Sequence, residues 1–448
     1  MRRHSTLNRT YYTIVTLVLM TLAALQSYAS ESGPLIDLLI RKGIITDQEA
    51  EDLRAELAAE FADSSAGKIE IGSSVKQLKT KVDIRTRYQY EDSSKAGSSD
   101  KNHRSRWRYR IKIGADYLFA NGWSAGLQLE TAEASDSTNT DFGGYFDKNG
   151  DGIFLGQVYI DYTNSTDWAD LTNLTIGKKK QPFLISSAFW DGDINPEGFT
   201  EQLGWRLSGE DWFTLRAGQY LIDEEREDKS PVAEDDWLFM GQAEYKKHLG
   251  MKSDFRIAPM FLVETGGTTS SATAEAGNTP TNENGIPYFK DFFAVAVPME
   301  YTFLANEKPQ TIWAMFGVNL YGDDAVNTEG SPYRPSNAEV GETFDSKNRF
   351  FNVGYTYGKT KTIKDWSVSL EYRYIEAAAF TPNLSDSDFG KNTLNQAGFV
   401  LSGGYMVSDS IKLGATIMHS SQIDDDWAST VAGKGDVDLL QIDLNAKF

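Results

Sequence analysis

Residues 106–130 read RWRYRIKIGADYLFANGWSAGLQLE, and their side chains alternate in character. One side of this stretch is apolar and carries Trp107, Tyr109, Ile111, Ile113, Ala115 and Tyr117. The other side is basic and carries Arg106, Arg108, Arg110 and Lys112. Successive side chains of a β-strand point to opposite faces, so this period of two predicts a strand between lipid and water. Asn121-Gly122 then predicts a tight hairpin turn into a second strand that begins at Trp123.

The same alternation recurs from about residue 78 to the last residue. It predicts strands near residues 78–90, 104–119, 122–132, 153–162, 173–181, 199–208, 212–222, 236–246, 252–264, 290–304, 310–321, 348–359, 364–376, 394–406, 410–420 and 437–448. Long and short connections alternate between them, as at 91–103 and 120–121. That threading is typical of outer-membrane barrels, whose long loops are extracellular. We therefore expect an all-β fold, a closed antiparallel transmembrane β-barrel of about 16 strands over residues 71–448.

The composition is compatible with a barrel without deciding the fold. The 448 residues include 10 Trp, 21 Tyr and 24 Phe, although the mean hydropathy is only -0.43. In a transmembrane barrel only alternate residues face lipid, and aromatic side chains collect at both interfaces. A secreted β-sandwich or propeller would share part of this composition. The chain has no cysteine, which excludes disulfides and thiol chemistry.

The N-terminal region has the three parts of a secretory signal peptide. Arg2, Arg3 and Arg9 precede an apolar run from Ile14 to Leu25, and Ser27-Tyr28-Ala29 supplies a cleavage site. The run is shorter than the roughly 18 apolar residues of a membrane span, so we expect residues 1–29 to be removed rather than retained as an anchor.

A helical pattern fills much of residues 30–70, which we expect to form a periplasmic segment and linker. Leu35, Ile36, Leu38, Leu39 and Ile40 predict a short apolar helix that ends at Gly43, and the capping box Thr46-Asp47-Gln48-Glu49 predicts the start of a second helix. Two interpretations stay open for this segment. It is either a passive spacer or plug-like element, or a periplasmic contact for oligomerisation or the cell wall.

The formal charge limits the partners of the chain. The net charge of -20 becomes -23 when Arg2, Arg3 and Arg9 are removed with the signal peptide. Such an acidic surface repels phosphates, which argues against nucleic-acid binding.

The last strand and two short motifs resemble a known family. Leu440, Ile442, Leu444, Ala446 and Phe448 occupy alternate positions up to the C-terminus. A final strand that ends in Phe448 resembles the assembly signal of Gram-negative outer-membrane proteins. With the segment 35–46 and the stretch GKKKQPF at 177–183, the chain most resembles the putative-porin family of Gram-negative bacteria.

This resemblance has functional implications. It implies an outer-membrane porin through whose water-filled barrel ions and small hydrophilic solutes diffuse passively, without a cofactor or metal. It also implies a homotrimer, contacts with outer-membrane lipid and lipopolysaccharide, and insertion by the barrel assembly machinery. The substrate is not implied, and a substrate-selective channel for anions or oligosaccharides is the alternative.

The loop near residues 182–198 is the candidate constriction, because porins of this kind fold the loop after the fifth strand into the lumen. It contains Asp191, Asp193 and Glu197 and no basic residue. We expect it to face a basic wall formed by Arg85, Arg87, Arg106, Arg108, Arg110 and Lys112. An acidic loop opposite a basic wall sets up a transverse field in the pore. In the alternative interpretation the loop lies outside and the arginines only solvate the inner wall.

Other motifs are weaker. The stretch 147–152 imitates the start of a calcium loop, but Val158 stands where a bidentate Glu is required. A barrel hydrolase is a remote alternative, since only His419-Ser420-Ser421 brings a histidine and hydroxyls together. Catalysis by serine also needs a base that touches the hydroxyl and an acid that orients the base. We therefore do not expect an enzyme.

Overall fold

The structure of the chain is a computed structural model, which describes residues 41–42, 46, 48–51, 74–95, 101–132, 137–143, 152–224, 235–250, 252–265, 292–321, 347–376, 379–381, 384–391, 394–423 and 434–448. The chain divides into two compact units, Met1–Val75 and Lys76–Phe448. None of the described helices is long and apolar enough to cross a membrane.

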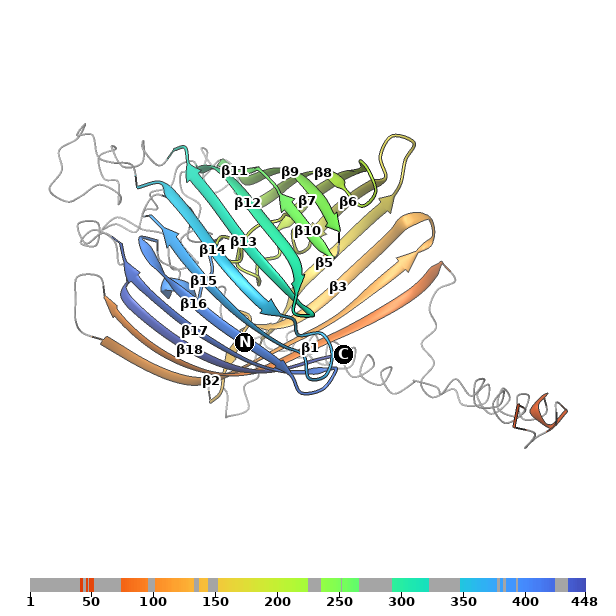
Figure 1. Ribbon diagram of the computed structural model, residues 1–448, viewed down its shortest axis with the longest axis horizontal. Coiled ribbons are helices and arrows are strands. Elements are labelled where there is room, and N and C mark those ends of the chain that lie inside the picture. The colour runs from red at the N-terminus through yellow and green to blue at the C-terminus, as the bar shows by residue number, and fades with distance from the viewer. Residues whose placement is uncertain are drawn as a thin grey trace, which may run out of the picture. The chain divides into compact units, whose positions relative to one another are not determined.

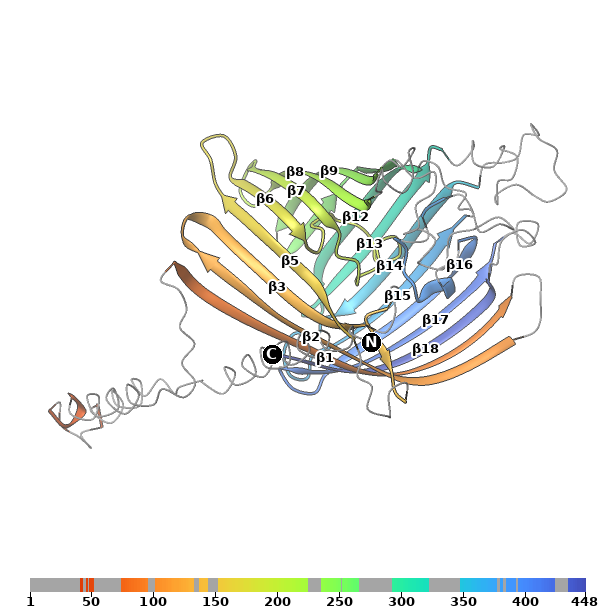
Figure 2. The same cartoon turned by 180° about the vertical axis from the view of Figure 1, so that it is seen from behind.

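The second unit is one antiparallel sheet, drawn from both sides in Figures 1 and 2. Its first strands are β1 (Val75–Lys95), β2 (Lys101–Phe119), β3 (Trp123–Ala132), β4 (Thr140–Asp141), β5 (Gly152–Asn164), β6 (Leu171–Lys178), β7 (Glu197–Arg206), β8 (Trp212–Asp223) and β9 (Asp236–Gly250). The others are β10 (Ser253–Ile257), β11 (Met260–Thr265), β12 (Phe292–Ala305), β13 (Lys308–Asn319), β14 (Arg349–Gly358), β15 (Trp366–Ile375), β16 (Gln396–Met406), β17 (Ile411–Gln422) and β18 (Lys434–Lys447). Two short 3-10 turns, η1 (Ala120–Gly122) and η2 (Phe389–Lys391), complete the elements.

The sheet closes on itself, because β1 pairs with both β2 and β18. The predicted barrel of 16 spanning strands is confirmed: β4 is a two-residue addition, while β10 and β11 are two parts of one spanning strand. Both parts pair with β9 and β12, and Ala258 and Pro259 separate them. Proline has no N–H for the ladder, which explains the interruption. Closure leaves no free sheet edge.

Short turns join the strands at one end of the barrel. Asn121 and Gly122 have φ angles of 58° and 83°, as the predicted Asn-Gly turn requires. Only Asn306 and Glu307 separate β12 from β13, again with positive φ. Since the number of spanning strands is even, β1 begins and β18 ends at this same end.

The outer surface of the barrel is apolar, and the predicted register of the last strand is confirmed. The outward side chains of Ile442 and Leu444 are 44% and 49% exposed, whereas that of Gln441, which points into the barrel, is 3% exposed. Aromatic pairs such as Trp123–Tyr162 and Tyr357–Trp366 lie near the short turns. They match the interfacial girdle of an outer-membrane barrel.

The first unit contains the predicted capping box. The Thr46 main-chain N–H donates to Glu49 Oε2 at 2.8 Å, and the Glu49 N–H donates to Thr46 Oγ1 at 3.3 Å. Residues 48–51 of the helix that it opens are described. The predicted signal peptide and most of residues 30–70 lie outside the described residues.

Candidate functional site

A loop between β6 and β7, residues 179–196, runs inside the barrel, and we refer to it as the first inner loop. Gln242 on β9 binds both main-chain groups of Leu184: its Oε1 accepts from the N–H at 2.9 Å, and its Nε2 donates to the C=O at 2.8 Å. Asn352 on β14 donates to Ser186 Oγ at 2.7 Å, and Gln157 on β5 donates to Asn195 Oδ1 at 3.2 Å. These strands belong to different sides of the ring, so the loop crosses the interior.

Two facing glycines allow this loop to leave the wall. Gly177 of β6 pairs with Gly198 of β7, with φ angles of 120° and 152°. A Cβ atom at Gly177 would lie 2.3 Å from the Val158 carbonyl oxygen, and one at Gly198 would lie 2.0 Å from the Gln219 carbonyl oxygen. A side chain at either position would therefore force the strands apart.

An apolar cluster inside the barrel holds the first inner loop in place. Phe189 of the loop is fully buried, with its ring centroid 4.6 Å from that of Phe350 and 5.5 Å from that of Phe380. Phe380 belongs to a second inner loop, residues 376–395 between β15 and β16. The two loops also bond directly, since the Asp191 N–H donates to the Leu384 carbonyl oxygen at 2.8 Å. Both loops thus form one packed body against β11 to β15.

Asp193 at the far end of the first inner loop contacts the basic wall. Its Oδ1 lies 3.1 Å from Lys112 Nζ and 3.3 Å from Arg110 Nη1, and its Oδ2 accepts from the Thr138 hydroxyl at 2.7 Å. Burial alone would raise the pKa of this carboxyl, but Lys112, Arg110 and Thr138 together lower that pKa from 3.8 to about 2. Asp193 therefore carries a negative charge at neutral pH, which partly offsets the positive charge of the basic wall.

The second inner loop contributes another carboxylate to the same wall. Asp388 Oδ2 lies 3.4 Å from Arg87 Nη1 and accepts from Gln441 Nε2 at 2.8 Å. Arg87 also forms a two-pronged pair with Asp443 of β18, at 2.7 and 2.9 Å. Two nitrogen atoms on one carboxylate fix the guanidinium in direction as well as position.

Asp141 of the short strand β4 pairs with two arginines of the basic wall, Arg106 and Arg108. It lies 2.9 Å from Arg108 Nε and 3.3 Å from Arg106 Nη1. Lys112 has a second partner in Glu130, at 2.9 Å. Most of the wall is therefore already paired within the chain.

Arg85 differs from the other wall residues. Its Nη2 donates to Asn139 Oδ1, a neutral amide oxygen, at 2.5 Å. Among the described residues no carboxylate lies within ion-pair distance of its guanidinium, and its Nε has no hydrogen-bond partner. Arg85 lies beside Arg87 on the inward face of β1, and the carboxylates of Asp443 and Asp193 interact with its charge only over distances longer than an ion pair.

The predicted acidic residues have three different positions. Asp193 lies inside, on the wall itself. Asp191 also lies inside, but its Oδ2 accepts from the Ser387 N–H at 3.0 Å and so joins the two inner loops. The prediction was wrong for Glu197, which does not face the basic wall. It begins β7, points outward and pairs with Lys178 at 2.9 Å. The strand begins two residues earlier than expected, at 197 instead of 199, so Glu197 belongs to the strand and its side chain lies on the outer face.

Sequence reasoning missed Asp141, Asp388 and Asp443. The second inner loop does carry a sequence signal, because Phe380, Leu384 and Phe389 are apolar residues between two predicted strands. Apolar side chains in a loop indicate burial. Asp141 and Asp443 carry no such signal, since their contacts join residues far apart in the chain. The calcium-like stretch lies mostly outside the described residues.

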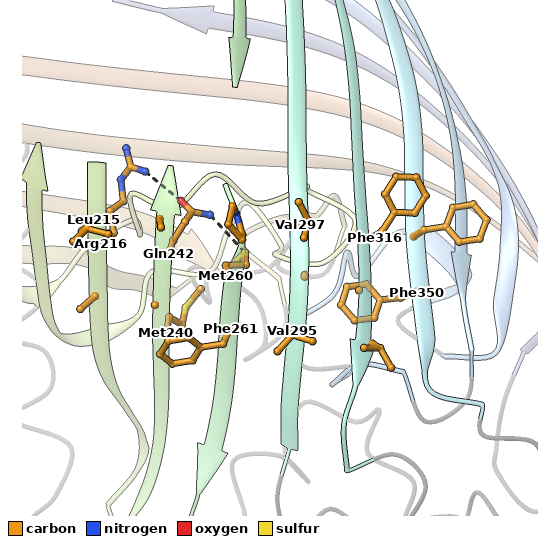
Figure 3. Close-up of a pocket in the computed structure, with 18 of the residues that line it drawn as sticks. Leu215, Arg216, Met240, Gln242, Met260, Phe261, Val295, Val297, Phe316 and Phe350 are labelled. Atoms are coloured by element: carbon orange, nitrogen blue, oxygen red, sulfur yellow. Dashed lines mark hydrogen bonds between the residues drawn. The ribbon is translucent and has the colours of Figure 1, made fainter. Parts of the chain in front are cut away.

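An apolar groove among the described residues does not belong to this site. Its volume is about 1200 Å³, residues of β7 to β14 line it, and Figure 3 shows most of them. Phe261 and Phe316 in this lining are 43% and 49% exposed on the outer face. The Gln242 side chain points to the other face of the sheet, toward Arg216 (Figure 3). In a bilayer the groove faces acyl chains rather than the pore.

One protein family and several solved structures are similar to this chain. Residues 89–289 and 290–448 match the family described as putative porin. No curated protein matches the chain significantly. Among solved structures, OprB of Pseudomonas putida is 9% identical with a TM-score of 0.48, covering 83% of this chain and 94% of that one. OmpF of Salmonella typhi, in complex with daunomycin, is 10% identical with a TM-score of 0.47, covering 85% and 100%. The outer membrane channel DcaP of Acinetobacter baumannii is 11% identical with a TM-score of 0.44, covering 85% and 99%.

The family match spans most of the chain and coincides with the closed barrel. It identifies a channel. The chain belongs to the putative-porin family and is an outer-membrane channel for the passive diffusion of small solutes.

Proposed function

We propose that this porin has a weak preference for anions, which Arg85 sets at a constriction formed by the two inner loops and the basic wall. The supporting observation is the pairing of Arg85 with a neutral amide while its neighbours pair with carboxylates. A charge without a direct carboxylate partner, in a confined, low-dielectric wall, attracts counterions more strongly than an exposed surface charge does. Transport of this kind needs no catalysis and no cofactor.

The local charge balance argues that the preference is weak. Six carboxylates contact or neighbour the six residues of the wall: Asp83, Glu130, Asp141, Asp193, Asp388 and Asp443. Asp83 is shared with Lys447, at 3.0 Å, which leaves a small positive excess. Asp141 and Asp193 already offset the charges of Arg108 and Arg110, so we expect these two arginines to contribute less to selectivity than Arg85 does.

The test is the reversal potential of purified protein in a planar bilayer under a salt gradient. Two unit charges about 10 Å apart in water interact by roughly 0.4 kcal/mol, which is about twofold in ion partition. Loss of the positive charge halves the partition of anions and doubles that of cations, so we expect Arg85→Gln to lower the anion-to-cation permeability ratio by about fourfold at low salt. The difference should shrink at high salt, where the Debye length is short.

Lys178→Gln is the matched control, because it removes the same charge from the outer face, where Lys178 pairs with Glu197. We expect its reversal potential to equal that of the wild type. Equal potentials for Arg85→Gln and the wild type would refute the role of Arg85 and leave the channel function intact. A strong cation preference of the wild type would refute the anion preference itself.

The homotrimer is also a proposal, and polar side chains on the outer face support it. Gln219 on β8 donates to Glu201 on β7 at 3.1 Å, and both stand among outward apolar neighbours. Charged groups on a lipid-facing strand are costly, so this face is better suited to contact another copy of the chain.

Export and assembly complete the proposal. We propose that residues 1–29 are cleaved and that the barrel assembly machinery recognises Phe448, which is 60% exposed. Its main chain exchanges hydrogen bonds with Val82 at 2.9 and 3.1 Å, next to the closure of the barrel. The finished barrel would lie in outer-membrane lipid and lipopolysaccharide.

A further inference from the structure

Three side chains on the outer face of β17 and β18 form a Ser–His–Asp arrangement. Ser421 Oγ lies 3.3 Å from His419 Nε2, and His419 Nδ1 lies 2.7 Å from Asp438 Oδ1. His419 and Asp438 are directly opposite each other in the antiparallel pair. The sequence offers only a histidine and hydroxyls on one strand, and the fold adds the carboxylate.

The contacts assign a role to each ring nitrogen. With Nδ1–H donating to Asp438, Nε2 is left as the acceptor for the Ser421 hydroxyl. The second carboxylate oxygen of Asp438 lies 3.6 Å from Lys101 Nζ, which helps to hold the carboxylate in place. This is the order of contacts in which a histidine takes the proton of a serine while an acid orients the ring.

The surroundings of the three residues indicate the substrate. Phe399 stands opposite His419 on β16, and Ile417 precedes it by two residues; they are 52% exposed each. Both therefore lie on the apolar outer face, directly beside the polar group. His419 and Asp438 are themselves about half exposed, at 52% and 46% of the side chain. An acyl chain on the apolar face would place its ester carbonyl at the boundary with water, where these polar groups stand.

We propose that Ser421 and His419 form an esterase site on the outer face of this porin, with Asp438 as the positioning residue and an acyl ester of a membrane lipid as the substrate. Ser421 Oγ bonds to the ester carbonyl carbon while His419 Nε2 takes the hydroxyl proton. His419 returns this proton to the alcohol oxygen as its bond to the acyl carbon breaks, leaving an acyl-serine. Water then attacks the acyl-serine, with His419 accepting its proton and delivering it to Ser421, so that a fatty acid is released.

The first experiment uses the full-length protein in detergent, with a fluorophosphonate probe and p-nitrophenyl esters of short and long acyl chains. We expect the probe to modify Ser421, identified by mass spectrometry of the labelled peptide. Ser421→Ala should abolish labelling, and His419→Ala should lower kcat by roughly a thousandfold. Ser420→Ala is the matched control, because Ser420 is adjacent, faces the interior and is 1% exposed. We expect that variant to react like the wild type.

The gel shift on heating shows that each variant has folded, and single-channel conductance should be unchanged in Ser421→Ala because the site lies outside the pore. Absence of labelling at Ser421 in folded protein would overturn the proposal, as would hydrolysis that persists in Ser421→Ala. Vesicles of phosphatidylethanolamine test the substrate. Release of fatty acid supports a lipid ester, and hydrolysis of soluble esters alone refutes that part.

The positioning role of Asp438 requires a measurement that would stay unchanged if this residue only stabilised the fold. Asp438→Asn should lower kcat for the long-chain ester with little effect on KM, because the carboxylate acts on the ring and not on the substrate. Asp438→Glu should recover part of that loss. Equal kcat values in the wild type and Asp438→Asn would remove Asp438 from the site.

Discussion

At the residue scale, the interior of this barrel is a set of ion pairs rather than two separate charged surfaces. Asp193 lies within 3.3 Å of both Arg110 and Lys112, and Asp388 reaches Arg87 from the second inner loop. A charge with a direct partner contributes little field at a distance. In the function proposed above, selectivity therefore depends more on Arg85, which has no direct carboxylate partner among the described residues, than on the number of arginines.

Asp193 allows a prediction with a defined pH range. Because its pKa falls from 3.8 to about 2 in the folded protein, its ion pairs contribute stability in full above about pH 4 and lose it as the pH falls toward 2. We expect steady single-channel currents from pH 7 to pH 4, and noisier currents near pH 2 as the first inner loop loosens.

Asp193→Asn should show the noisy currents already at pH 7, together with a shift of the reversal potential toward anions because Arg110 and Lys112 lose their partner. Glu197→Gln is the control, since it removes the same charge from an outward position. Currents of Asp193→Asn that match the wild type at pH 7 would contradict the anchoring role.

At the scale of the elements, alternation along each strand separates two solvents. On β18 the outward Ile442 is 44% exposed, and on β17 the outward Ile417 is 52% exposed. Inward positions nearby are polar, as at Thr416 and Gln441, which are paired across β17 and β18. The period of two in the sequence therefore reflects lipid on one face of the sheet and a polar interior on the other.

Arginine substitutions test this register. We expect Ile442→Arg to reduce the yield of folded barrel, because an outward arginine meets lipid at a cost of roughly 2–4 kcal/mol near the midplane. Thr416→Arg, an inward position at similar depth, should fold nearly as well as the wild type. Gln441 is a poor control because it is 3% exposed and bonds to Asp388. Equal folding yields of the two variants on unheated gels would contradict the register.

At the scale of the whole molecule, closure explains how a chain without cysteine resists unfolding. The pairing of β1 with β18 runs from Asp83–Lys447 to Lys95–Lys434 and leaves no edge strand exposed. Every spanning strand therefore has two hydrogen-bonded neighbours. In lipid, breaking such a ladder exposes main-chain groups that no water can satisfy.

This closure predicts heat-modifiable migration. In sodium dodecyl sulfate without boiling we expect a compact band that differs from the boiled chain, because the closed barrel excludes detergent from its backbone. The proposed homotrimer should appear as a further, slower band in mild detergent, weakened by Glu201→Lys on the outer face. Identical migration before and after boiling would contradict a stable barrel, and a single monomer band in mild detergent would contradict the trimer.

The alternation in residues 106–130 and its repeats determined the barrel, the strand number and the faces, because lipid and water act on each side chain locally. The capping box at Thr46 and the turn at Asn121-Gly122 were equally local. Only the tertiary structure decided that Asp193 contacts the wall, that Glu197 faces outward, that Asp388 and Asp141 neutralise arginines, and that Asp438 joins His419. These contacts link residues from 19 to about 300 positions apart, through loops that pack inside the ring and strands that pair across it. The periodicity of the sequence predicts which face of the sheet a residue occupies, but not which residue of another segment it contacts on that face.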